Sequence, residues 1–150
     1  MKDCIFCLIV QGEIPAAKIW ADEHFLAFLD NRPNTRGMTL VIPKEHHPSY
    51  VFDLEDDFYQ SYFLAVKKVA RLLEKALNVP RVIMTMEGLG VDHAHIKLYP
   101  VYGLGEKFEA HESEQKVFFE KFPGYTTTQP GPPADPEELQ KLAEEIRRHN

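Results

Sequence analysis

The spacing of apolar positions predicts short strands near the start of the chain. Residues 24–29 and 38–42 are two short apolar runs, separated by a segment rich in turn-forming residues. Short apolar runs bounded by Asn, Pro and Gly are typical of strands joined by a loop. We therefore expect residues 24–29 and 38–42 to form a neighbouring antiparallel pair.

The pattern changes to a helical period between Leu54 and Leu77. Apolar residues there recur at steps of three and four, with charged residues between them, as on an amphipathic helix. Asp53 is expected to cap the start of this helix, and Asn78 with Pro80 to end it.

Two further strands are expected at residues 81–86 and 92–99. Because side chains alternate along a strand, the second strand separates its polar and apolar residues onto opposite faces. The polar face would carry His93, His95, Lys97 and Tyr99, and the apolar face Ala94, Ile96 and Leu98. Burying such a polar row without partners would cost several kcal/mol. The row must therefore meet a ligand, a metal, solvent or backbone groups, and a solvated face or satisfied core histidines are the two structural alternatives.

The end of the chain predicts one more helix. Asp135 is a good N-cap, Pro136 suits the first helical position, and an apolar stripe follows. The stripe consists of Leu139, Leu142, Ala143 and Ile146. The order of strands and helices indicates an α+β fold with a mostly antiparallel sheet.

Composition narrows the class of protein. The 150 residues, 44% of them hydrophobic, suffice for one folded core. The net charge of -6 argues against binding to polymeric nucleic acid, which requires clustered Lys and Arg. The apolar runs are shorter than the roughly 20 residues that cross a bilayer. No membrane association or secretory signal is expected, so the predicted location is the cytoplasm.

The two cysteines, Cys4 and Cys7, have the spacing of one half of a zinc site. A complete site would need two further ligands from elsewhere in the chain. Two other interpretations remain open, a redox dithiol and a pair of ordinary buried thiols.

Three parts of the chain carry a set of motifs in a fixed order. The N-terminal part has Cys4-Ile5-Phe6-Cys7, followed by Gly12-Glu13-Ile14-Pro15-Ala16 and by residues 22–30. The middle part has Gly37-Met38-Thr39-Leu40-Val41-Ile42-Pro43-Lys44-Glu45-His46, and the later part has His93-Ala94-His95-Ile96-Lys97-Leu98-Tyr99-Pro100. Together these segments, which span residues 4–103, resemble the histidine triad (HIT) family of nucleotide hydrolases and transferases. The middle part is similar to the family's Gly-His-Thr-Leu-Val-Ile-Pro-Lys-x-His stretch, and the later part is similar to the triad itself.

The resemblance implies a HIT-like α+β domain at residues 1–105, with a five-stranded antiparallel sheet and one long helix. Residues 106–150 would form a C-terminal helical extension packed on the same domain. The family usually forms a homodimer, which implies a second copy of the chain as partner.

The resemblance also implies a nucleotide site. By position, Ile5, Phe6, Ile9 and Phe28 would line the base pocket, although ordinary core packing is the alternative for these four residues. Asp30 would accept hydrogen bonds from the ribose hydroxyls, or it could simply form a turn before Asn31.

The triad residues would divide between catalysis and metal binding. His95 matches the middle histidine, the family's nucleophile, whose neutral imidazole can attack the α-phosphorus and form a nucleotidyl-histidine intermediate. A structural Zn²⁺ ion would be held by Cys4, Cys7, His46 and His93, with His47 as a rival for His46. A closed Cys₂His₂ shell leaves no open position, so the metal would brace the strand rather than activate water.

Met38, in place of the histidine of Gly-His-Thr, is a lesser departure from the family pattern, and two further departures concern the phosphate-contacting positions. Lys97 stands in place of the third histidine, and Leu89 stands where many members have a phosphate-contacting glutamine. A lysine ammonium can hold phosphoryl oxygens but is a poor proton shuttle near neutral pH. The predicted function is a nucleotide-binding hydrolase or transferase acting at the α-phosphate of a phosphoramidate or dinucleoside polyphosphate, with His95 and Lys97 as catalytic residues. The alternative is a catalytically weakened nucleotide-binding or sensing module with a structural zinc.

Overall fold

The computed structural model divides the chain into two compact units, residues 1–106 and 107–150. It describes residues 4–105, 107, 109–128 and 130–149. Residues 1–3 of the predicted domain, and residues 106, 108, 129 and 150 of the predicted extension, lie outside the described residues. Each unit is considered by itself below.

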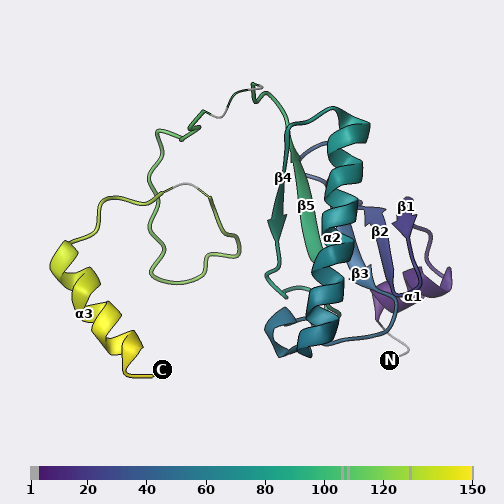
Figure 1. Ribbon diagram of the computed structural model, residues 1–150, viewed down its shortest axis with the longest axis horizontal. Coiled ribbons are helices and arrows are strands. Elements are labelled where there is room, and N and C mark those ends of the chain that lie inside the picture. Colours follow the sequence, from purple (N-terminus) through teal and green to yellow (C-terminus); the bar gives the residue numbers. More distant parts are fainter. Residues whose placement is uncertain (1–3, 106, 108, 129, 150) are drawn as a thin grey trace. The chain divides into compact units, whose positions relative to one another are not determined.

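The first unit is built on a five-stranded antiparallel sheet (Figure 1). The strands lie in the order β1 (Lys18–Ala21), β2 (Phe25–Leu29), β3 (Thr39–Pro43), β5 (Ile96–Val101) and β4 (Arg81–Thr85). The predicted α+β fold with this sheet is confirmed. The sequence pattern located four of the five strands but did not locate the short strand β1.

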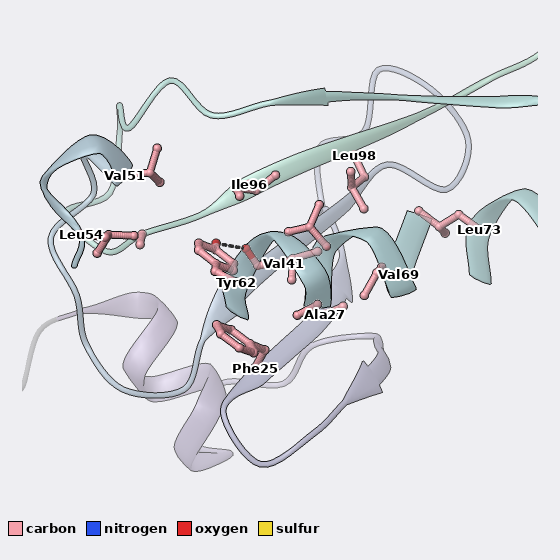
Figure 2. Close-up of a cluster of buried hydrophobic side chains, with 13 residues drawn as sticks. Phe25, Ala27, Val41, Val51, Leu54, Tyr62, Val69, Leu73, Ile96 and Leu98 are labelled. Atoms are coloured by element: carbon pink, nitrogen blue, oxygen red, sulfur yellow. Dashed lines mark hydrogen bonds between the residues drawn. The ribbon is translucent and has the colours of Figure 1, made fainter. Parts of the chain in front are cut away.

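The long helix α2 (Asp56–Leu77) packs against one face of the sheet (Figures 1 and 2). Its buried residues recur at the helical spacing that the sequence predicts, and they meet alternate residues of the strands. The helix contributes Tyr62, Ala65, Val66, Val69 and Leu73, and the strands contribute Phe25, Ala27, Val41, Ile96 and Leu98.

The predicted cap of α2 is wrong, whereas its predicted end is confirmed. Asp53 lies in a short 3₁₀ helix, η1 (Val51–Asp53), which the buried Val51 side chain anchors in the core. The N-cap is therefore Glu55, whose side chain makes no capping hydrogen bond. Asn78 ends the helix in the left-handed conformation, with φ of 51°.

Tyr62 links α2 to the central strand β3. Its hydroxyl is fully buried and donates a 2.6 Å hydrogen bond to the Val41 carbonyl (Figure 2). Burial raises the pKa of Tyr62 well above its usual value. The folded protein therefore keeps a proton that the unfolded chain loses above about pH 10, so stability falls as the pH rises beyond that point.

Replacing Tyr62 with phenylalanine is expected to lower the free energy of unfolding by about 1–2 kcal/mol at pH 7, because the Val41 carbonyl loses a buried donor. The same variant should lose less stability than the unmodified protein when the pH rises above about 10. Urea denaturation at pH 7 and above pH 10 measures both effects. Equal alkaline losses in the two proteins would contradict this account.

The opposite face of the sheet is covered by a short helix, α1 (Ile5–Gln11), that the sequence pattern did not predict. Alternate residues of β2 and β3 pack against α1 in a second apolar cluster. This cluster consists of Phe6, Ile9, Leu26, Phe28, Leu40 and Ile42. Gly12 ends the helix with φ of 84°, a conformation that glycine adopts without a steric penalty.

Strand β5 begins at Ile96, so the predicted start at Asp92 is wrong. The pairing of β3 with β5 ends with Val41 opposite Ile96, and Pro43 has no N–H with which to extend this ladder. Instead, the Ala94 N–H donates to the His47 carbonyl at 2.9 Å. The alternation of faces nevertheless continues through residues 93–95, because Ala94 belongs to the α2-facing core.

The second unit contains helix α3 (Pro136–Arg147). Asp135 caps it as predicted, since its Oδ1 accepts a 2.8 Å hydrogen bond from the Glu137 N–H. Helix α3 has no buried side chain. That this extension packs on the first domain stays a prediction. No helix among the described residues is long and apolar enough to span a bilayer.

Candidate active site

Cys4, Cys7, His46 and His93 form one cluster, although they come from distant parts of the chain. Their potential ligand atoms all lie within 4.8 Å of one another. His93 Nδ1 lies 3.4 Å from Cys4 Sγ and 3.6 Å from Cys7 Sγ, and Cys7 Sγ lies 3.6 Å from His46 Nδ1. Cys4 immediately precedes α1 and Cys7 lies within it, so the start of this helix presents both thiols to the histidines.

The spacing and chemistry of this cluster fit a tetrahedral zinc ion. Zn–S and Zn–N bonds of about 2.3 and 2.0 Å separate S and N ligand atoms by roughly 3.5 Å, close to the distances above. The His93 Nε2–H donates to the Pro43 carbonyl at 2.9 Å, which leaves the Nδ1 lone pair free for a metal. The four residues could therefore hold a metal ion.

The protonation tendencies of His93 and Cys7 affect metal binding in opposite directions. Burial lowers the pKa of His93, which keeps its imidazole neutral. Burial, together with the neighbouring Cys4 thiol, raises the pKa of Cys7. A metal must displace the Cys7 proton, so metal affinity should fall with decreasing pH.

The structure separates His46 from its rival His47. The His46 ring lies in the cluster, with its centroid 5.1 Å from that of His93. The His47 ring instead stacks on Phe58 with 4.0 Å between centroids, so it packs beside α2 and lies outside the cluster.

His95 is almost fully buried, with 2% of its surface exposed. Its Nδ1–H donates a 2.7 Å hydrogen bond to the backbone carbonyl of His93, so Nε2 carries the lone pair. The Phe6 ring packs edge-on against both histidine rings, with centroids 5.7 Å from His93 and 5.5 Å from His95. His93 thus connects the two parts of the site, since its ring faces the thiols and its carbonyl fixes the tautomer of His95.

The histidines of the polar row therefore do not face solvent, because His93 is 0% exposed. In each of the two rings, one nitrogen donates a hydrogen bond to a backbone carbonyl, as expected of a core histidine. His95 differs from an ordinary core histidine because it also lines a pocket.

This pocket has a volume of about 850 Å³, within the range of small-molecule sites. It brings together every residue predicted for nucleotide binding or catalysis. These are Ile5, Phe6, Ile9, Phe28, Asp30, His95 and Lys97. Phe6, Ile9 and Phe28 are also core residues, as the alternative interpretation expects, and their contact with a base stays a prediction. Leu89, which occupies the family's glutamine position, lines the same pocket.

Asp30 takes part in a turn and in the pocket wall. Its Oδ1 accepts a 2.7 Å hydrogen bond from the Arg32 N–H, which confirms the turn interpretation. Asp30 and Arg32 both line the pocket, and the sequence did not single out Arg32.

Lys97 forms an ion pair with Glu87, a residue that the sequence did not single out as functional. The Lys97 and Glu87 side chains are 22% and 30% exposed. Thr85, the last residue of β4, pairs directly with Lys97 on β5, so Glu87 follows two residues further along the same face. Only the register of these two strands could have revealed the pair.

Known proteins resemble this chain in sequence and in fold. The HIT domain family model matches residues 11–102. A protein named hit from Bacillus subtilis is 42% identical over 114 residues, covering 73% of this chain and 78% of the relative. Adenosine 5'-monophosphoramidase hnt1 from Schizosaccharomyces pombe is 34% identical over 148 residues, covering 95% of each chain.

A solved structure shows a comparable fold with metal. The zinc-bound histidine triad family protein from Mycobacterium smegmatis superposes with a TM-score of 0.63 at 31% identity, covering 76% of this chain and 85% of that one. With the matching family model and the relatives above, the chain belongs to the HIT family.

Proposed function

We propose that this protein is a nucleotide hydrolase or transferase that acts at the α-phosphate of a nucleoside phosphoramidate or dinucleoside polyphosphate. One observation carries the proposal, namely a buried His95 that lines a pocket and whose Nδ1–H is held by a backbone carbonyl. Its relation to a named adenosine 5'-monophosphoramidase supports the phosphoramidate class.

The pocket residues suggest how a nucleotide would bind. The apolar side chains of Ile5, Phe6, Ile9 and Phe28 would contact the base, which offers flat apolar faces. The Asp30 carboxylate would accept hydrogen bonds from the ribose hydroxyls. The Lys97 ammonium would hold the phosphoryl oxygens, because it lies two residues beyond His95 on the same side of the chain.

Catalysis would proceed in two displacements. His95 Nε2 attacks the α-phosphorus, and the electron pair of the breaking P–N or P–O bond passes to the leaving group, which takes a proton from solvent where it needs one. Water then attacks the phosphorus of the nucleotidyl-histidine, releasing the nucleoside monophosphate, a proton and free His95. A second acceptor in place of water would make the reaction a transfer.

The metal that fits Cys4, Cys7, His46 and His93 is proposed to be zinc, as in the related mycobacterial structure. A bound zinc would supply a structural crosslink between α1 and the segment containing the two triad histidines, because four protein ligands close its shell. Both thiols must be reduced to serve as ligands, which supports the cytoplasm as the location.

The second candidate is a nucleotide-binding module that has lost catalysis. It is favoured by the Glu87–Lys97 pair, since a lysine engaged by a carboxylate occupies the place of the family's third histidine. The two candidates differ in turnover but share nucleotide binding.

Incubation of the zinc-loaded protein with adenosine 5'-phosphoramidate and with diadenosine tetraphosphate tests the proposal. Formation of AMP from either compound, followed by chromatography and dependent on His95, supports the hydrolase. Saturable AMP binding without any product would establish the binding module instead.

We also propose a homodimer, formed through the outer face of α2 and the edge strand β4. An apolar groove of about 600 Å³ lies there, and among the residues that the structure describes no further strand pairs with the outer side of β4. The groove is lined by Tyr59, Gln60, Phe63, Leu64, Val66, Lys67, Ala70 and Met84. An antiparallel edge strand and an apolar helix face can pair with a second copy about a two-fold axis.

Replacing Leu64, which is 60% exposed, with lysine should convert a dimer into a monomer. A charge buried at the interface is expected to weaken dimerisation by at least about 100-fold, whereas Leu64→Met should leave it nearly unchanged. Sedimentation equilibrium of the three proteins measures this. A wild type that is monomeric, or a Leu64→Lys protein that still dimerises as tightly, would rule out this interface.

A further inference from the structure

The ion pair between Glu87 and Lys97 places a carboxylate beside the part of the pocket where phosphate chemistry would occur. Lys97 lines the pocket together with His95, and Glu87 neutralises the Lys97 charge from the neighbouring strand end. The two side chains lie on the same face of the sheet, as the opposition of Thr85 and Lys97 requires.

This pairing changes which phosphate groups the pocket favours. A lysine ammonium on its own attracts a group more strongly as its negative charge increases. With Glu87 attached, the pair has no net charge, and the carboxylate lies beside Lys97, which lines the same pocket as His95. Salt only partly screens charges that lie so close to one another. A polyphosphate chain at that point would bring several negative charges close to the Glu87 carboxylate.

We propose that Glu87 is a specificity-determining residue that selects α-phosphoryl groups carrying an amine over those carrying a polyphosphate. The inference rests on the proposed function, because it concerns the leaving group in that same site. An amine leaving group adds no negative charge, and its nitrogen gains a proton as the P–N bond breaks, which a nearby carboxylate favours. A polyphosphate leaving group retains its negative charge and is repelled.

The primary test measures the binding of nucleotides, without turnover. Dissociation constants for AMP and for ATP, measured by calorimetry without magnesium, are compared between the unmodified protein and Glu87→Gln. The ratio of the ATP constant to the AMP constant should fall about tenfold in Glu87→Gln, and the change should shrink as salt is added. Glu74→Gln is the matched control, because it removes a comparable ion pair with Arg71 on α2 and should leave the ratio unchanged.

The conservative variant Glu87→Asp separates charge from structure. It keeps the carboxylate, so its ratio should stay close to that of the unmodified protein. A ratio that does not move in Glu87→Gln, or that moves as far in Glu87→Asp, would overturn the proposal. Thermal melting of each variant shows whether the compared proteins are folded.

Turnover rates provide a second test of the proposal. The ratio of kcat/KM for adenosine 5'-phosphoramidate to that for diadenosine tetraphosphate should fall about tenfold in Glu87→Gln. If no variant turns over either compound but the binding ratio shifts as expected, the proposed catalytic function fails and the role of Glu87 in charge selection stands. Failure of both nucleotides to bind would remove both proposals.

Discussion

Replacing His95 with alanine is expected to lower kcat/KM by at least about a thousandfold for any substrate that the protein hydrolyses. The variant removes the nucleophile, so the nucleotidyl intermediate cannot form and only the positioning of the phosphoryl group remains. Steady-state rates of AMP formation from adenosine 5'-phosphoramidate measure this loss.

Two comparisons separate a chemical defect from a structural one. His95→Asn retains an N–H that can donate to the His93 carbonyl but has no nucleophilic nitrogen, so it should be as inactive as alanine while preserving the fold. His24→Ala alters a histidine whose side chain is 67% exposed, and it should keep full activity. Activity in both His95 variants within tenfold of the unmodified protein would contradict the proposed mechanism.

Replacing Cys7 with serine is expected to abolish stoichiometric zinc binding and to lower the melting temperature by about 15 °C. A ligand present at about 1,000 times its dissociation constant stabilises a folded protein by roughly 4 kcal/mol, which corresponds to a shift of that size in a domain of this length. Metal analysis and thermal melting, with zinc and after chelation, measure the two effects.

His47→Ala is the matched control for the metal site. His47 is adjacent to His46 but stacks on Phe58, so its loss should reduce stability without releasing the metal. Zinc should also dissociate from the unmodified protein as the pH falls, because the raised pKa of Cys7 makes its thiolate harder to retain in acid. A Cys7→Ser protein that retains one tightly bound zinc would contradict the assignment of the four ligands.

Loss of the metal should also affect His95, although His95 is not part of the metal cluster. The His93 ring belongs to the metal cluster, and the His93 carbonyl accepts the His95 Nδ1–H. A shift of His93 would therefore alter both the orientation and the tautomer of the nucleophile.

The fold was predictable where hydrophobic periodicity is strong. The 22 residues of α2 contain apolar residues at a clear helical spacing, and the core strands β2 and β3 are apolar runs in the sequence. By contrast, α1 has only seven residues, too few for a periodic pattern to stand out. The start of β5 was misplaced because the alternation of faces continues through residues 93–95 while the backbone leaves the β3 ladder.

The candidate site was predictable in its individual residues but not in its electrostatics. Resemblance to the HIT family supplied the four cluster residues, and the fold brought their ligand atoms together. Choosing His46 over His47 required the stacking of His47 on Phe58, which no sequence pattern records. The Glu87–Lys97 pair likewise depends on the β4–β5 register, because an acidic residue in a loop has no distinguishing signal by itself.

The nucleophilic role of His95 is tested by detecting the covalent intermediate. Zinc-loaded protein is mixed in excess with adenosine 5'-phosphoramidate, quenched within one turnover, and analysed by intact-protein and peptide mass spectrometry. We expect one adenylyl group attached to His95, absent from His95→Asn. Release of AMP with no adduct, or an adduct on another residue that persists in His95→Asn, would contradict it.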